Sequence, residues 1–228
     1  MDTGRAKYIA GRDADASSPD TLIALAGRGS SLVSDRRSDF YGAAFPVSGA
    51  GEAMDVIAGI KKANPGARHT AYAYIAAGSR GTEKRYSDDG EPQGTAGRPM
   101  LELLERAGLD GALVAVTRYF GGILLGTGGL YRAYSGAAAE ALSDAGSVVM
   151  RKYALMSAEF GYDEWARTEK SLRTDICRII GCDYSSSVAV SAAVPPEGAE
   201  RFRALVSDIT CGRSSPAVSG YRYYRFTE

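Results

Sequence analysis

The chain has 228 residues, no formal net charge and 45% hydrophobic residues, which is ordinary for a globular protein and excludes wholesale disorder. Split at residue 148, it carries 16 basic and 17 acidic groups before that point and 11 and 10 after it. Neither half therefore has the bulk positive charge that would indicate nucleic-acid binding by itself. Three cysteines without a CxxC pair, and the single histidine His69, exclude a disulfide framework, a zinc ribbon and a histidine-rich metal site.

The N-terminal twenty residues are polar and of mixed charge, which predicts an arm with little order and no signal peptide. No apolar run approaches the roughly 20 residues that a membrane helix needs. We therefore expect a cytoplasmic protein without a membrane partner.

The first domain is predicted over residues 21–147, with short strands alternating with amphipathic helices. Residues 68–76 alternate, so that Ala71, Ala73 and Ile75 lie on one face of a strand and three polar or aromatic residues lie on the other. Residues 112–117 form a continuous apolar run, typical of a strand that is covered on both faces. The remaining predicted elements are strands at 31–33 and 40–45, a helix from Ala53 to Asn64, a helix ending at Gly108 and an alanine-rich helix from about Gly128.

The second domain is predicted over residues 148–228 and has the order βαββαβ of a ferredoxin-like fold. Its strands are expected at 148–160, 179–184, 188–194 and 218–226, and its helices at 163–173 and around 202–209. The predicted class is therefore α+β.

The first segment that carries chemistry is Asp88–Gly97, where Asp88, Asp89 and Glu91 stand just before a helix. Carboxylates are ligands that Mg²⁺ prefers, and a helix N-terminus attracts anions, so this segment is a candidate for a metal–phosphate pair. The alternative is structural: the aspartates cap backbone N–H groups, and Thr95 and Gly97 only begin the helix. No phosphate-binding lysine accompanies the segment, which favours the structural alternative.

The second segment is Arg118–Gly129, in which a buried strand ends in Arg118, Tyr119 and Phe120 and a five-glycine loop leads into a helix. Such a layout is typical of an anion site, and Arg118 and Arg132 flank the loop as bidentate donors. The alternative is that the glycines only allow a tight turn and close packing. If the two arginines form an anion site, Arg118→Ala leaves the stability of the free protein nearly unchanged. A large loss of stability would instead make Arg118 structural.

Two further features have both a functional and a structural interpretation. His69 begins a predicted strand beside basic residues, and a lone histidine is more often structural than catalytic. The segment Tyr221–Phe226 interleaves aromatic residues with arginines. That pattern is found on sheets that bind RNA, and equally on half-buried edge strands.

The strings DDGEPQGTAGRPML and VTRYFGGILLGTGGLYRAY resemble the YigZ/IMPACT family, with PGARHTAYAY and SDF matching upstream, from about Ser31 to Ala145. Asp39 departs from the family, which usually has a basic residue there. The resemblance implies a bacterial-type member, with a two-layer first domain similar to ribosomal proteins and to domain IV of elongation factor G. It implies a ferredoxin-like second domain similar to domain V of that factor. It brings no catalytic assignment.

The candidate ligand- or anion-binding residues are the motif positions together with two loop glycines: His69, Asp88, Asp89, Glu91, Thr95, Arg118, Tyr119, Gly121, Gly122, Arg132 and Tyr134. The function that the resemblance favours is a non-enzymatic, translation-linked protein that binds RNA, the ribosome or a translation-associated protein, without a cofactor. One alternative is a Mg²⁺-dependent enzyme acting on a phosphorylated small molecule or nucleotide. Another is a protein-interaction module, whose sign would be an exposed apolar patch.

Overall fold

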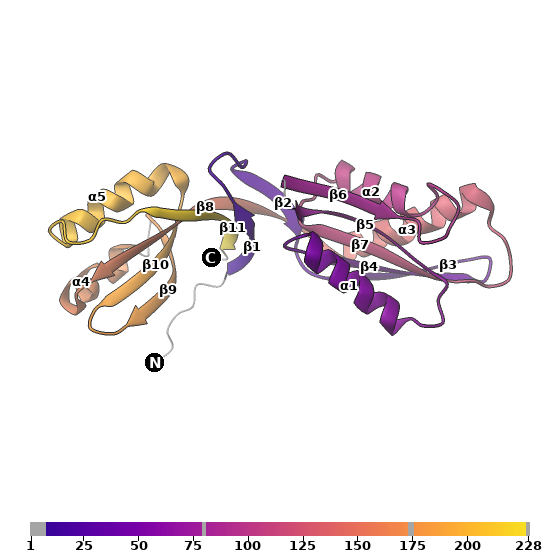
Figure 1. Cartoon of the computed structure of the whole chain (residues 1–228), viewed down its shortest axis with the longest axis horizontal. Helices are drawn as coiled ribbons and strands as arrows, with labels where there is room; N and C mark the ends of the chain where they lie inside the picture. Colours follow the sequence, from indigo (N-terminus) through magenta and orange to yellow (C-terminus); the bar gives the residue numbers. More distant parts are fainter. Residues whose placement is uncertain (1–7, 79–80, 173–175, 227–228) are drawn as a thin grey trace. The chain divides into compact units, whose positions relative to one another are not determined.

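The computed structural model describes residues 8–78, 81–172 and 176–226 and divides into two compact units (Figure 1). The N-terminal unit is Leu22–Val149, and the C-terminal unit joins the described part of Met1–Thr21 to Met150–Glu228. Each unit contains an antiparallel sheet with helices, so the α+β class is confirmed. Among the described residues, no helix is long and apolar enough to cross a membrane.

The N-terminal unit is built on a five-stranded antiparallel sheet of order β3-β4-β7-β5-β6. Its strands are β3 (Gly29–Asp35), β4 (Ser38–Pro46), β5 (His69–Gly78), β6 (Gly81–Ser87) and β7 (Ala112–Tyr119). Its helices are α1 (Ala50–Ala63), α2 (Gly97–Arg106) and α3 (Gly126–Ala145). Strand β6 was not predicted, because its residues lack an apolar alternation and five of the seven are exposed.

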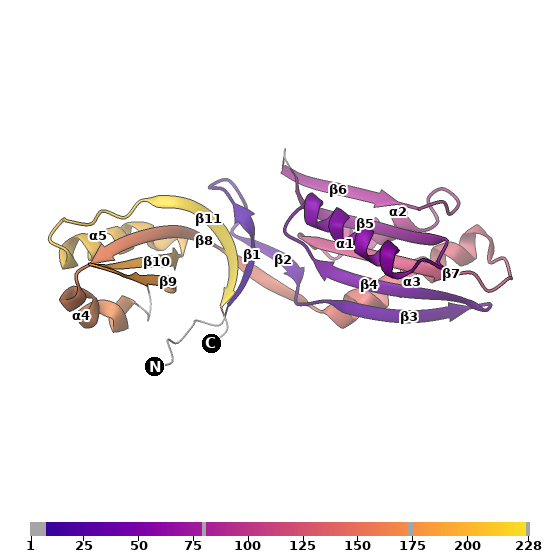
Figure 2. The same ribbon diagram turned by 60° about the horizontal axis from the view of Figure 1, so that its bottom comes forward.

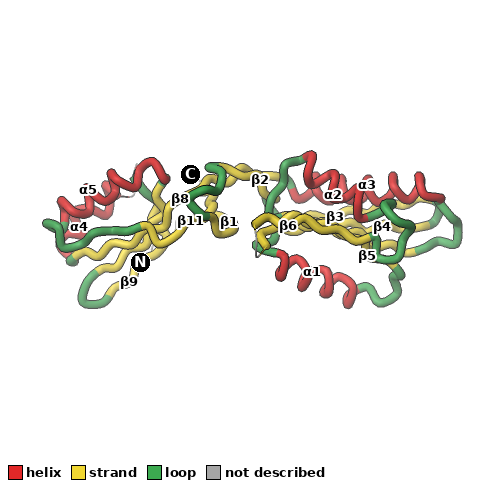
Figure 3. The backbone as a smooth tube through the Cα atoms, turned by 45° about the horizontal axis from the view of Figure 1, so that its top comes forward, coloured by secondary structure: helices red, strands yellow, loops and turns green. Residues whose placement is uncertain are grey.

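Helices cover both faces of this sheet (Figure 3). Ala71, Ala73 and Ile75 of β5 pack with buried residues of α2 and α3, as the alternation predicted. Tyr72 and Tyr74, on the opposite face, pack with α1. The unit therefore has three layers where two were expected. The rings of these tyrosines are buried under α1, and the Tyr74 hydroxyl donates to Glu83 Oε1 at 2.6 Å.

Helix α3 lies close against β3 and β4, and small residues make this approach possible. A Cβ atom added at Gly42 would lie 2.6 Å from the backbone oxygen of Ala137, and one added at Gly29 would lie 2.2 Å from that of Ala141. The buried alanines of α3 face the sheet at these points. This contact fixes the β3–β4 hairpin to the rest of the unit.

The C-terminal unit has the ferredoxin-like order of elements and the strand order β11-β8-β10-β9. Its elements are β8 (Ser147–Phe160), α4 (Tyr162–Leu172), β9 (Arg178–Tyr184), β10 (Val188–Val194), the 3₁₀ turn η1 (Pro196–Gly198), α5 (Ala199–Ile209) and β11 (Val218–Phe226). The predicted end of α4, at Arg173, lies outside the described residues.

The N-terminal arm differs from its prediction. Tyr8–Ala14 forms strand β1, which pairs antiparallel with β11 at the edge of the C-terminal sheet, and Asp13 forms an ion pair with Arg222 at 2.6 Å. A second short strand, β2 (Thr21–Leu25), pairs with β8. The polar composition of the N-terminal twenty residues concealed this strand, which pairs with β11 through backbone hydrogen bonds.

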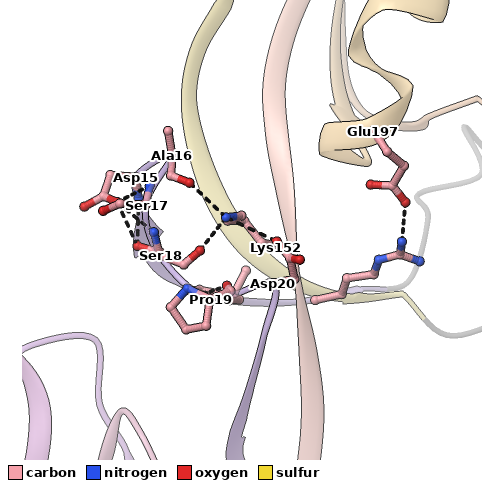
Figure 4. Close-up of polar contacts among 10 residues, drawn as sticks. Asp15, Ala16, Ser17, Ser18, Pro19, Asp20, Lys152 and Glu197 are labelled. Atoms are coloured by element: carbon pink, nitrogen blue, oxygen red, sulfur yellow. Dashed lines mark hydrogen bonds and ion pairs between the residues drawn. The ribbon is translucent and has the colours of Figure 1, made fainter.

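A buried lysine fixes the turn that follows β1 (Figure 4). Lys152 is 5% exposed, and its ammonium group donates to the carbonyl oxygens of Ser18 and, at 3.2 Å, Ala16. Asp20 Oδ1 lies 3.4 Å from the same group. Within the turn, Asp15 accepts hydrogen bonds from the backbone N–H groups of Ser17 and Ser18.

Replacing Lys152 with methionine keeps most of the side-chain volume but leaves these carbonyl oxygens without their donor. We expect the free energy of unfolding to fall by about 2 kcal/mol, the range for hydrogen bonds to a charged group. Arg151→Met is the matched control, because Arg151 is about half exposed and pairs with Glu197 at the surface. Urea unfolding of both variants checks this expectation, which fails if the two lose equal stability.

Candidate functional site

Asp88 closes the N-terminus of α2, as the structural alternative predicted. Its Oδ1 accepts hydrogen bonds from the N–H groups of Ala96 at 3.0 Å and Gly97 at 2.8 Å, and its Oδ2 accepts one from Gly94 at 2.8 Å. Three amides thus occupy this carboxylate. The buried Thr95 donates to the carbonyl of Pro92 at 2.6 Å and stabilises the same loop.

Asp89 joins this loop to α1 and β5. Its side chain lies 2.5 Å from Lys61 Nζ and accepts the N–H of Thr70 at 2.7 Å. Its carbonyl oxygen lies 2.8 Å from His69 Nδ1, and since a carbonyl only accepts, this nitrogen carries the proton. Asp89 has a φ of 47°, so the loop holds it in the left-handed region. These contacts give His69 and Asp89 structural roles.

A buried ion pair lies beneath the loop. Glu91 Oε1 accepts hydrogen bonds from Arg118 Nη1 and from the Tyr134 hydroxyl, each at 2.8 Å. The side chains of Glu91 and Arg118 are only 4% and 7% exposed. Burial, and next the negative charge of Glu91, raises the pKa of the Tyr134 phenol far above its usual range. We call Glu91, Arg118 and Tyr134 the buried network.

The structure does not bring Arg118 and Arg132 together as a pair of anion donors. Arg118 is buried, paired with Glu91 and placed between the rings of Phe40 and Phe120, 5.5 and 5.2 Å from their centroids. Arg132 is exposed on α3. Tyr134, only two positions further along this helix, faces the core, and two residues rotate a helix by roughly 200°. Of these two arginines, only Arg132 is therefore available to a ligand.

Tyr119 lies on the face of the sheet that carries α1. Its hydroxyl donates to Asn64 Oδ1 at 2.9 Å, and its ring meets that of Tyr41 edge to face, with centroids 5.6 Å apart. It is therefore not part of the buried network, although it adjoins Arg118 in sequence. Opposite faces of the sheet separate the two side chains, because neighbours in a strand alternate.

Gly121 and Gly122 position the loop that follows β7. A Cβ atom at Gly121 would lie 1.8 Å from the backbone oxygen of Arg37, and Gly122 has a φ of 87°. Ser38 Oγ accepts the N–H of Gly121 at 3.2 Å. The glycine loop is thus packed against the β3–β4 turn, and both views place the two segments at the same end of the sheet (Figures 1 and 2).

No sequence pattern indicated the β3–β4 turn itself. Asp35 pairs with Ser38, so Arg36 and Arg37 alone form the turn, and their φ values are 45° and 65°. Positive φ at both central residues is the requirement of a type I′ turn, which normally selects Asn-Gly. Two arginines in this position gave no turn signal. Their only sequence signal is a pair of basic residues between two predicted strands.

Five exposed residues gather where this turn meets the glycine loop. Arg36 and Arg37 are exposed, and Arg36 Nη1 donates to the carbonyl oxygen of Leu124 at 3.4 Å. The apolar members are 41 to 80% exposed. We call this set the tip surface: Arg36, Arg37, Phe120, Ile123 and Leu124. Neither arginine forms an ion pair with a carboxylate of the described residues.

The candidate metal–phosphate segment does not fit a magnesium ion. The carboxylate of Asp88 accepts hydrogen bonds from backbone amides. That of Asp89 is bound by Lys61 and by the N–H of Thr70, and that of Glu91 is bound by Arg118 and Tyr134. In the described ranges, no three His, Cys, Asp or Glu residues are grouped so that they could hold a metal. The three carboxylates are thus engaged by protein donors rather than directed at a common point.

The aromatic–arginine segment Tyr221–Phe226 is also engaged. It lies in β11, an inner strand between β1 and β8. Tyr223 is buried and its hydroxyl donates to the carbonyl of Pro19 at 2.6 Å, while Arg222 pairs with Asp13. The edge-strand interpretation is therefore wrong, because β1 pairs with this strand on its outer side. The base-stacking interpretation is weakened, because the ring of Tyr223 is buried.

The chain is thus a two-unit α+β protein, and exposed cationic and apolar side chains meet at the tip surface of its first unit. The model of the Impact N-terminal domain matches residues 36–142. The chain is 39% identical over 180 residues to an IMPACT family member of Thermus thermophilus, covering 78% of this chain and 96% of that protein. It is 32% identical to the IMPACT family member YigZ of Escherichia coli, and the match covers 78% of this chain and 87% of that protein.

A solved structure of a hypothetical protein superposes with a TM-score of 0.65 at 29% identity, covering 88% of this chain and 98% of that one. The chain belongs to the IMPACT family. The resemblance that the motifs indicated is thereby confirmed.

Proposed function

We propose that this protein is a non-enzymatic RNA-binding protein that acts on translation, and that the tip surface of its N-terminal unit contacts the RNA. The observation that carries the proposal is the pair of exposed arginines held at positive φ, neither of which forms an ion pair with a carboxylate of the described residues. Each such residue costs about 1–3 kcal/mol, and strained residues of this kind gather at functional sites. Asn-Gly would form the same turn without this strain.

The chemistry of the tip surface suits RNA. Arginine binds phosphate through two hydrogen bonds, and an exposed aromatic ring such as Phe120 stacks on bases. Arg118 of the buried network contacts the Phe120 ring, and Gly121 packs against Arg37, which supports a rigid surface that needs little ordering on binding. The link to translation rests on the family resemblance, which implies domains similar to those of elongation factor G.

The double variant Arg36→Asn with Arg37→Gly tests the proposal, because it removes both charges and relieves the turn. We expect the melting temperature to rise and the affinity for a labelled oligouridine to fall at least about tenfold, since one charge-assisted hydrogen bond contributes about 1.5–3 kcal/mol. Fluorescence anisotropy at low salt measures the affinity.

The matched control is Arg98→Gln with Arg106→Gln, which removes the same charge from α2, over the opposite edge of the sheet. Equal affinity losses in the two double variants would show that only net charge matters. No binding of oligouridine by the unmodified protein would refute the proposal itself.

A second candidate function is docking of a protein partner, and the exposure of the glycine loop favours it. Leu124 is 80% exposed, and Ile123 and Phe120 beside it are 41% and 45% exposed. Leu124→Ser, which removes apolar area without charge, is the variant to compare in co-sedimentation with ribosomes. Loss of co-sedimentation with unchanged oligouridine affinity would favour this second candidate.

A further inference from the structure

A second surface adjoins the tip surface, on the face of the sheet that carries α1. Helix α1 packs over β5 and β7, whereas no helix of the described residues lies over β3 and the adjoining part of β4 on this side (Figure 2). Leu32 and Tyr41 are directly paired across these two strands and are 55% and 44% exposed. We call this uncovered part the open face.

The Tyr41 ring is held in a fixed position. It meets Tyr119 edge to face, and the Tyr119 hydroxyl is in turn bonded to Asn64 at the C-terminus of α1. An edge-to-face partner contacts a ring on one side and leaves a face free to stack. Tyr41 is therefore an exposed aromatic ring with a supported orientation.

Arginines stand at both ends of the open face. Arg36 and Arg37 form the turn at one end of β3, and Arg28 precedes this strand at the other, its guanidinium 5.4 Å from the centroid of the Phe45 ring. The seven residues of β3 span roughly 23 Å at about 3.3 Å per residue. A face of this length with an exposed aromatic ring and cations at both ends is complementary to a short single strand, which presents bases along one side and phosphates along the other.

We infer that single-stranded RNA lies along the open face, with a base stacked on Tyr41 and its phosphates on Arg28, Arg36 and Arg37. This inference rests on the proposed function and names the nucleic acid and the path that it takes. Asp39 is the acidic residue on this face, next to Tyr119 in register, and its Oδ1 accepts the Ser34 hydroxyl at 2.6 Å. Its charge opposes the phosphates, so it limits the affinity.

Tyr41→Ala, Tyr41→Phe and Asp39→Asn test the inference with a fluorescein-labelled oligouridine of about 12 nucleotides, within the usual size of a single-strand site. We expect Tyr41→Ala to weaken binding about tenfold, Tyr41→Phe to preserve it, and Asp39→Asn to tighten it at low salt. Tyr86→Ala is the control, since Tyr86 is 43% exposed but lies on β6 at the other edge of the sheet.

The outcomes separate the two proposals. If the Arg36→Asn, Arg37→Gly variant loses RNA binding while Tyr41→Ala and Tyr86→Ala bind equally well, RNA does not lie along the open face. The proposed function would still stand. Binding that the unmodified protein does not show at all would refute both. Photocrosslinking of a 4-thiouridine oligomer to the peptide that contains Tyr41 would support the inference directly, and crosslinks confined to other strands would overturn it.

Discussion

Replacing Glu91 with alanine is expected to lower the free energy of unfolding by about 3–5 kcal/mol, the cost of removing one partner from a buried ion pair. Arg118 would then remain buried without its carboxylate, and the Tyr134 hydroxyl would lose its acceptor. Urea unfolding of the variant measures this loss. The result would also decide the role of Arg118, which is a structural residue here rather than a free anion donor.

Glu102→Ala is the matched control for this prediction. Glu102 pairs with Arg98 one turn earlier on α2, and the two side chains are 39% and 66% exposed. An exposed pair of this kind contributes about 0.5 kcal/mol or less. If Glu91→Ala cost no more than Glu102→Ala, the buried network would not be what stabilises the end of the sheet.

Gly121→Ala is the second change with a large expected effect. Its new methyl group would lie 1.8 Å from the backbone oxygen of Arg37. A side-chain rotation cannot relieve this contact, because it joins a Cβ atom to a backbone atom. We expect a stability loss of about 3 kcal/mol, the upper part of the usual range for overpacking. Because the loop must move away from the turn, the tip surface should also lose RNA affinity.

Gly59→Ala provides the comparison, since Gly59 lies within α1 and an added Cβ would meet nothing within 4 Å. Alanine is the better helix former by about 1 kcal/mol, so this variant should gain stability. Thermal unfolding of both variants, followed by anisotropy with the oligouridine, tests the pair. Equal melting temperatures would show that the Gly121 contact relaxes at no cost.

Hydrophobic periodicity predicted most of the fold. The alternation in β5, the apolar run of β7 and the order of elements in the C-terminal unit all follow from which side chains must be buried. Strands β1 and β6 could not be predicted in this way. The residues of β6 are mostly exposed, and β1 lies in an N-terminal segment that is polar overall. Both strands pair through backbone hydrogen bonds, which every sequence can form.

The candidate site was predicted as a region but not as a set of contacts. Sequence motifs indicated Asp88, Glu91 and Arg118 as candidate binding residues, yet whether a charged group is free or paired depends on its three-dimensional neighbours. The contacts of Tyr119 could not be predicted for the same reason. It follows Arg118 directly in the sequence, but side chains alternate along a strand, so it lies on the other face of the sheet. The β3–β4 turn was missed because arginines replaced the usual turn residues.

The salt dependence of oligouridine binding tests the central claim most directly. Each phosphate that a protein neutralises on a single strand contributes about −0.7 to the slope of log affinity against log salt concentration. If Arg36 and Arg37 each contact a phosphate, the Arg36→Asn, Arg37→Gly variant should lose about 1.4 from the magnitude of the slope of the unmodified protein. An unchanged slope in this variant would contradict the claim that the tip surface binds RNA.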